Sequence, residues 1–171
     1  MIDLQTVLTY LTLISVPVGV VYHIMTLRNT RRNQELQLET RQAQMFSGIM
    51  ARANTAERRK ALSTFLYTNW SNFEEFLEWI DPFNPEYSQN FDDLNLIFGH
   101  YEYMGVLVRE GLVGIRLVAL AEGGAIRSMW EKIAPFIDDF RDALHAPRYA
   151  SEWEYLYNEL VKYVEEHPEL R

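Results

Sequence analysis

Leu4 to Leu27 reads LQTVLTYLTLISVPVGVVYHIMTL, and these 24 residues contain no Lys, Arg, Asp or Glu. A helix of that length measures about 36 Å, which is enough to cross a hydrocarbon core of about 30 Å. A cleaved signal peptide is disfavoured, because Met1-Ile2-Asp3 is not basic and no small-residue cleavage site follows the apolar run. A buried core helix is the other alternative, but apolar runs of core helices are usually about 10 to 14 residues long. The stretch therefore predicts a transmembrane anchor over residues 1–27.

The charges beside this anchor predict its orientation. Arg28, Arg31 and Arg32 follow the apolar run, whereas only Asp3 and the terminal amine precede it. Because basic residues remain on the cytoplasmic side, we expect a single-pass protein of the cell membrane with its N-terminus outside and its C-terminal domain in the cytoplasm. The same arginines are predicted to contact anionic lipid headgroups of the bilayer. The alternative is that they only determine the topology.

A seam of small and polar residues runs along the predicted anchor at helical spacing. Its members are Thr12, Ser15, Gly19, Tyr22 and Thr26. Small residues allow membrane helices to approach closely, and Ser15 with Gly19 forms a small-xxx-small pair. The seam predicts a self-association face, which would make the protein a homo-oligomer. Chance is the alternative, because Ser and Thr are common in membrane spans.

Charge separates the rest of the chain into two parts. Residues 28–60 carry eight basic and three acidic side chains and predict a basic, helical juxtamembrane neck. Residues 61–171 carry eight basic and twenty acidic side chains and predict an acidic domain, within a chain of net charge −8. Nucleic acid is not an expected partner, because binding to phosphates requires a basic face.

Hydrophobic periodicity predicts an all-α fold, in which a helical bundle follows the anchor and neck. Thr55 is expected to cap a helix, and Gly111 is expected to close a long helix that begins near Phe91. A short helix over 115–122 is expected to end at Gly123-Gly124, before a separate amphipathic helix over 126–144. The apolar stripe of that helix is Ile126, Trp130, Ile133, Ile137, Phe140 and Leu144.

Two capping boxes are expected to open further helices. The first is Ser71-Asn-Phe-Glu74, and the second is Ser151-Glu-Trp-Glu154, which precedes the last helix. No segment alternates with a period of two residues over a useful length, so no sheet is expected.

Few residues offer chemistry. The chain has no Cys, which excludes thiolate catalysis, disulfides and Cys-based metal sites. His100 with Tyr101 and Tyr103 is the one candidate pocket lining, although a histidine on an aromatic helix is more often a packing residue. No phosphate-binding loop, nucleophile motif or dinucleotide fingerprint occurs. We therefore assign no catalytic, cofactor-binding or metal-binding residue, and we expect no cofactor.

The last two-thirds of the chain resembles a family of proteins of unknown function. The resemblance covers roughly residues 28–163 and is carried by Tyr101–Val113, Ser128–Ile137 and Trp153–Tyr157. The residues that match are Gly105, Val106, Leu107, Gly111, Leu112, Trp130 and Arg141. On this basis the chain is identified as a member of domain-of-unknown-function family 4760, whose members are mostly small prokaryotic proteins with one N-terminal span and a helical domain. Gly114 stands where the family pattern has an acidic residue.

These features together favour a membrane-tethered cytoplasmic helical protein that acts as an interaction or accessory protein, or as a subunit of a larger membrane complex, and not as an enzyme. The alternative is a ligand sensor or enzyme that uses a pocket near His100. An ion-conducting oligomer built on the polar seam ranks last, because a single span without an internal charge is poor material for a pore.

Overall fold

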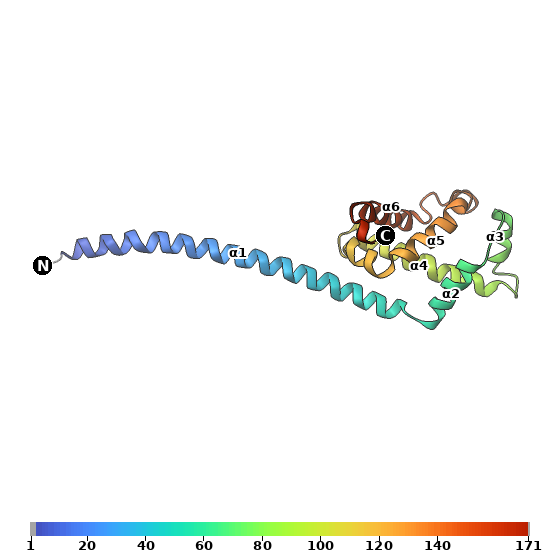
Figure 1. The fold of residues 1–171 in the computed structure, drawn as a ribbon, viewed down its shortest axis with the longest axis horizontal. Helices are drawn as coiled ribbons and strands as arrows, with labels where there is room; N and C mark the ends of the chain where they lie inside the picture. The colour runs from blue at the N-terminus through green and yellow to red at the C-terminus, as the bar shows by residue number, and fades with distance from the viewer. Residues whose placement is uncertain (1–2, 171) are drawn as a thin grey trace. The chain divides into compact units, whose positions relative to one another are not determined.

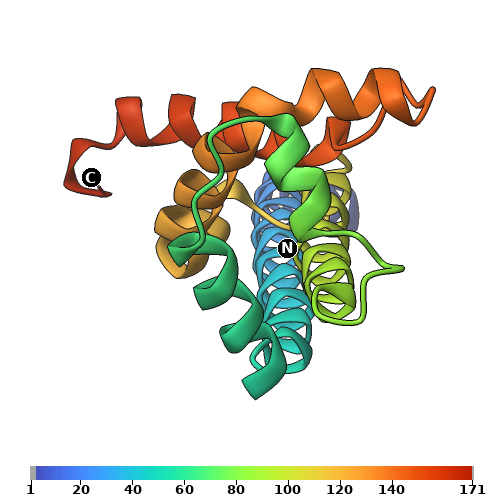
Figure 2. The same ribbon diagram turned by 90° about the vertical axis from the view of Figure 1, so that its right-hand side faces the viewer.

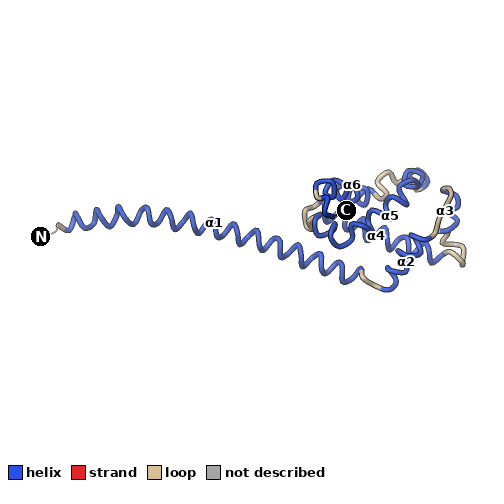
Figure 3. Tube along the Cα trace, in the orientation of Figure 1, coloured by secondary structure: helices blue, strands red, loops and turns tan. Residues whose placement is uncertain are grey.

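The computed structural model describes residues 3–170, except for the side chains of residues 6–12, 14 and 16. The elements are α1 (Leu4–Ala53), α2 (Ala56–Tyr67), α3 (Phe73–Trp79), α4 (Ser88–Arg109), α5 (Ile115–Ala143), α6 (Ser151–Glu166) and the 3-10 turn η1 (Pro168–Leu170) (Figure 1). Within the described residues every element is helical and no strand occurs (Figure 3). The expectation of an all-α protein is confirmed.

The chain divides into two units, residues 1–41 and 42–171, and each is described by itself. The first unit contains α1 up to Arg41; this helix of 50 residues continues without a break from the predicted anchor into the predicted neck, and its last part belongs to the second unit. Side chains between residues 20 and 41 are exposed. In the part of the chain that the structure describes, no helix is both long enough and apolar enough to cross a membrane.

The core of the second unit lies where α6 packs across α4 and α5, while α2 packs against α4 (Figures 1 and 2). Trp153 of α6 is fully buried there. Its ring centroid lies 4.9 Å from those of Phe98 and Tyr101, and 5.4 Å from that of Trp130. These four rings form the α4–α6 aromatic group, which joins three helices in one contact region.

A second group of rings surrounds Trp70 in the same unit. Trp70 lies 4.9 Å from both Phe76 and Trp79 and 5.3 Å from Phe65, measured between ring centroids. These four residues form the α2–α3 aromatic group. The ammonium of Lys132 in α5 lies 4.9 Å from the ring centroid of Trp70. It donates hydrogen bonds to the carbonyls of Leu66 in the last turn of α2 and of Thr68, the C-cap residue, so a positive charge from another helix offsets the negative C-terminal end of α2.

Helix α5 differs from the prediction. The expected break at Gly123-Gly124 is absent, and one helix of 29 residues continues through both glycines and through Pro135. Val118 before the glycines and Ile126 after them are both fully buried, so packing on both sides holds the helix together. The predicted stripe is buried except at its end, because Leu144 is 53% exposed and lies beyond the last residue of α5.

The caps of α3 and α6 also differ from the prediction. Asn72 and not Ser71 caps α3, since its side chain accepts a hydrogen bond from the backbone N–H of Glu75 at 2.8 Å. At α6 the expected cap, Ser151, is already the first helical residue. Instead, the carboxylate of Glu102 in α4 lies 3.3–3.4 Å from the first backbone N–H groups of α6. A neighbouring helix therefore provides the cap that the local sequence was expected to provide. The predicted cap of α2 at Thr55 is confirmed.

Candidate functional site

An open groove of about 490 Å³ lies beside His100 within the second unit. We call it the His100 groove. It is lined by Ile49, Arg52 and Ala53 at the end of α1, by Thr55, Glu57 and Arg58 at the start of α2, and by Asn95, Leu96, Gly99, His100 and Tyr103 of α4. The volume is in the range of small-molecule sites, which is roughly 300–1,000 Å³.

Three charged or titratable side chains from different helices meet behind the wall of this groove. Arg58 of α2 donates two hydrogen bonds to Glu122 of α5, from Nη1 to Oε1 at 2.9 Å and from Nη2 to Oε2 at 3.2 Å. Nε2 of His100 lies 2.8 Å from the same Oε2. All three side chains are more than nine-tenths buried. We call them the Arg58–Glu122–His100 cluster, and it ties α2, α4 and α5 together.

The cluster keeps Glu122 ionised. Burial by itself would raise the pKa of Glu122, but the hydrogen bond from His100 and the charge and hydrogen bonds of Arg58 outweigh burial and hold this pKa below its ordinary value. The guanidinium carbon of Arg58 lies 5.5 Å from the ring centroid of Tyr101, so the cation rests on an aromatic ring. Tyr101 is fully buried, and burial, reinforced by the charge of Glu122, raises its pKa far above the ordinary range.

The prediction that His100, Tyr101 and Tyr103 line one pocket is correct only in part. His100 and Tyr103 line the groove, whereas Tyr101 points into the core against Trp153. His100 is not only a packing residue, because the carboxylate of Glu122 holds its ring in a fixed orientation. Among the described residues, no group of three or more potential metal-ligating side chains occurs.

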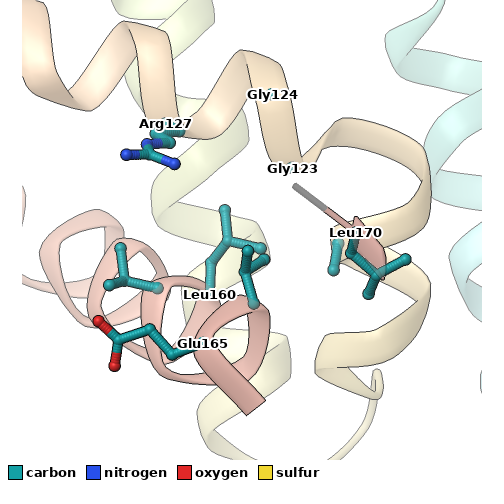
Figure 4. A pocket seen from close by; sticks show the side chains of 9 residues that line it. Gly123, Gly124, Arg127, Leu160, Glu165 and Leu170 are labelled. Atoms are coloured by element: carbon teal, nitrogen blue, oxygen red, sulfur yellow. The ribbon is translucent and has the colours of Figure 1, made fainter. Parts of the chain in front are cut away.

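A second pocket of about 400 Å³ lies between α5, α6 and η1 (Figure 4). Gly123 and Gly124 form one wall, and Arg127 and Glu165 lie on the same side of the pocket, with Leu170 opposite. Arg127 is exposed and already donates a hydrogen bond to Glu131 at 2.8 Å. The pocket thus offers volume and apolar walls, but no buried polar side chain that would position a ligand.

The predicted self-association and headgroup residues all lie on α1. Gly19, Tyr22 and Thr26 occupy the described part of this helix, and a Cβ at Gly19 would have no neighbour within 4 Å. Ser15 also lies on the helix, while the side chain of Thr12 is outside the described residues. The predicted headgroup contacts Arg28, Arg31 and Arg32 are exposed. Self-association through the seam and contact of these arginines with lipid headgroups both remain predictions.

Sequence reasoning missed Arg58 and Glu122. Arg58 was counted as part of a basic neck, yet it is 6% exposed and its charge is balanced by Glu122. Glu122 was expected at the end of a short helix, whereas it lies inside α5. The two residues are 64 positions apart, and no local pattern connects them. The one available indication was that Glu122 belongs to the same helical face as the buried residues Val118 and Ile126, at intervals of four residues.

The structure thus defines a class of all-helical proteins in which a long N-terminal helix leads into a bundle with a buried ion-pair cluster. The sequence model of the family described as "Domain of unknown function (DUF4760)" matches residues 13–160, and the chain belongs to this family. No curated protein and no solved structure matches the chain.

The residues that carried the family resemblance have structural roles in this chain. Arg141 donates hydrogen bonds to Asp138, to Glu154 and to the backbone carbonyl of Tyr149, so it joins α5 to the start of α6. Gly111 has a φ of +67°, a conformation in which glycine closes a helix. These roles explain the fold and indicate no reaction.

Proposed function

We propose that the protein is a membrane-tethered cytoplasmic interaction or accessory protein, in which α1 provides the anchor and the second unit binds other proteins. The observation that carries the proposal is α1 itself, a helix of 50 residues whose part up to Arg41 belongs to a unit of its own. An isolated helix is only marginally stable in water, and natural helices depend on the packing of one face. The first unit therefore requires a partner for α1.

Two different partners suit two different parts of α1. For residues 4–27, the absence of any charged side chain favours lipid. For the part after Arg32, Leu38 (59% exposed) and Met45 (41% exposed) are seven residues apart, so they share one exposed face of the helix, which favours another helix. That helix would come from a second copy of the chain or from a protein of a larger membrane complex.

The exposed arginines after residue 27 support the proposed orientation. Arg28, Arg31 and Arg32 are exposed and would lie at the cytoplasmic headgroups, where each is worth about 1 kcal/mol of attraction to anionic lipid. The acidic side chains of residues 61–171 would be repelled by the same surface, which would hold the domain away from it.

Membrane extraction and a topology reporter test the tether. In cell membranes washed with alkaline carbonate, the full chain should stay in the pellet, and a reporter that works only outside the cytoplasm should be silent when fused after Arg171. The matched control moves the three arginines to a position before Leu4, which should invert the topology and activate the reporter. Recovery of the wild-type chain in the carbonate supernatant would contradict the anchor, and an active wild-type reporter would contradict the orientation.

Purification from detergent tests the proposed interaction role. Proteins that copurify with the full chain should be lost when the exposed face after Arg32 is changed, for example by Leu38→Glu with Met45→Glu. A chain that purifies alone and as a monomer would contradict this role.

A ligand sensor or enzyme that uses the His100 groove is the second candidate. It is favoured by the Glu122–His100 hydrogen bond, because a histidine held by a carboxylate is a common arrangement in binding and proton transfer. Among the described residues that line the groove, none forms a hydrogen bond with His100 that would activate it as a nucleophile, which argues against catalysis.

A further inference from the structure

The tautomer of His100 follows from its partner. Glu122 is ionised and already accepts two hydrogen bonds from Arg58, so it can only accept from the imidazole. Nε2 of His100 therefore carries the proton that is shared with Oε2 of Glu122. In the neutral ring this leaves Nδ1 as a hydrogen-bond acceptor.

The other ring nitrogen of His100, Nδ1, has no partner within the described chain. No side chain or backbone group of the described residues forms a hydrogen bond with it, and it is not among the buried polar atoms that lack a partner. The side chain as a whole is 8% exposed, and it lines the groove. In a neutral ring, Nδ1 is thus a hydrogen-bond acceptor without a partner, on a buried and fixed side chain that lines the groove.

Gly99 leaves space beside this atom. Glycine is unfavourable inside a helix, and here neither the backbone nor the packing of the chain requires it, because a Cβ at Gly99 would meet nothing within 4 Å. Gly105, six residues further along α4, is different, since its Cβ would collide with Glu152. The open surface at Gly99 allows a ligand to approach the helix backbone next to His100.

The remaining lining determines what kind of ligand fits. Leu96 is 43% exposed and Tyr103 is 54% exposed on the same face of α4, and Ile49 of α1 adds a third apolar side chain. The charges at the rim balance, with one Arg52 against one Glu57, while the charge of Arg58 is balanced by Glu122. A neutral ligand with an apolar body matches this surface better than an ion does.

We propose that the His100 groove binds a neutral amphipathic alcohol or phenol, whose hydroxyl donates a hydrogen bond to Nδ1 of His100 and whose hydrocarbon part lies over Gly99 against Leu96 and Tyr103. The site lies wholly within residues 42–171 and does not depend on the proposed membrane anchor, so a failure of either proposal leaves the other intact.

Three matched probes test the ligand class on the detergent-solubilised full chain at pH 8. The probes are 4-methylphenol, which is neutral because phenols have a pKa near 10, 4-methylanisole, which lacks the donor, and 4-methylbenzoate, which is an anion. Binding is followed by the NMR signals of Nδ1 and Nε2 of His100. We expect 4-methylphenol to shift the Nδ1 signal and to bind about three- to tenfold more tightly than 4-methylanisole. Equal binding of these two probes, an unshifted Nδ1 signal, or tighter binding of 4-methylbenzoate would overturn the proposal.

Gly99→Leu provides the second test. The new side chain would occupy the space beside His100, and affinity for 4-methylphenol should fall at least about tenfold, by steric exclusion. Gly124→Leu is the matched control, because Gly124 is also a helical glycine with open space at its Cβ but lines the other pocket. Both variants are compared in the same micelles, so partition of the probe into detergent cancels. Unchanged affinity in folded Gly99→Leu, or an equal loss in Gly124→Leu, would overturn the proposal. The comparison of the three probes on the wild-type chain remains decisive if Gly99→Leu fails to fold.

Discussion

Gly105 of α4 and Glu152 of α6 are so close that a Cβ atom on Gly105 would lie 2.1 Å from the backbone carbonyl oxygen of Glu152. The obstacle is backbone, which cannot rotate away as a flexible side chain does. Gly105 therefore sets the distance between the two helices and brings Trp153 into contact with Tyr101. This close approach explains why a glycine occupies the middle of a long helix in this chain.

Gly105→Ala is expected to lower the free energy of unfolding by about 1–3 kcal/mol or more, because the added methyl group must push α6 away from α4. Urea denaturation followed by tryptophan fluorescence measures the change. Gly99→Ala is the matched control in the same helix, and it should raise the free energy of unfolding by up to about 1 kcal/mol, since its Cβ meets nothing. A loss of stability in both variants would show that the close approach is not the cause.

The Arg58–Glu122–His100 cluster predicts a pH dependence of stability. The pKa of Glu122 is lowered in the folded state, so its contribution is complete above the unfolded pKa of about 4.3 and is lost as the pH falls through the lower folded value. At pH 7, Glu122→Gln should cost about 3–5 kcal/mol, because Arg58 would stay buried without its partner. The difference from the wild type should shrink as the pH falls below about 4.

The comparison of the wild type with Glu122→Gln separates the effect of Glu122 from the effects of other acidic residues. Burial raises the pKa of Glu102, and that group shifts stability in the opposite direction, but it is present in both proteins and cancels in the difference. Glu131→Gln is the exposed control and should change stability by less than about 0.5 kcal/mol. A difference between the wild type and Glu122→Gln that is the same at pH 7 and pH 3 would refute the ionised cluster.

Trp153 is expected to be the costliest tryptophan to truncate. It is fully buried and its ring contacts three other rings, whereas Trp130 is 6% exposed and lies at the edge of the same aromatic group. Both substitutions to Ala should fall within about 3–5 kcal/mol, with Trp153→Ala at the upper end. Thermal and urea unfolding of the two variants would decide the order, and a smaller loss for Trp153→Ala than for Trp130→Ala would contradict it.

Self-association through the proposed anchor is tested at Gly19. If two copies pack along the predicted seam, Gly19→Leu should separate the helices and reduce crosslinking of the full chain in membranes. Val20→Leu changes a neighbouring residue off the seam and should leave crosslinking unchanged. Equal crosslinking in all three proteins, or none in the wild type, would argue against the seam.

Local sequence predicted the features of the fold that have local causes. The cap at Thr55 and the helix end at Gly111 depend on residues within one turn, and both occur as expected. The two glycines at 123 and 124 weaken a helix locally, yet α5 continues because its buried residues on both sides of them pack against the same core. Tertiary packing prevails over propensity at such positions.

The candidate site was predictable only in part for a related reason. His100 could be identified because histidine is rare and chemically distinctive, and only four occur in the chain. Its partners Arg58 and Glu122 could not be identified, because they lie on two other helices. Only the packing of those helices decides which of the many charged side chains become buried. The same applies to Glu102, which caps a helix 50 residues away.

The two aromatic groups divide the tryptophans of the chain evenly, with Trp70 and Trp79 in the α2–α3 group and Trp130 and Trp153 in the α4–α6 group. Within each pair the indole rings are 4.9 Å and 5.4 Å apart, close enough for their electronic transitions to couple. Each pair is therefore a coupled chromophore in the near-ultraviolet. Loosening of the packing around either pair would change the circular dichroism of the protein in that range, so the protein contains a built-in optical reporter of its order.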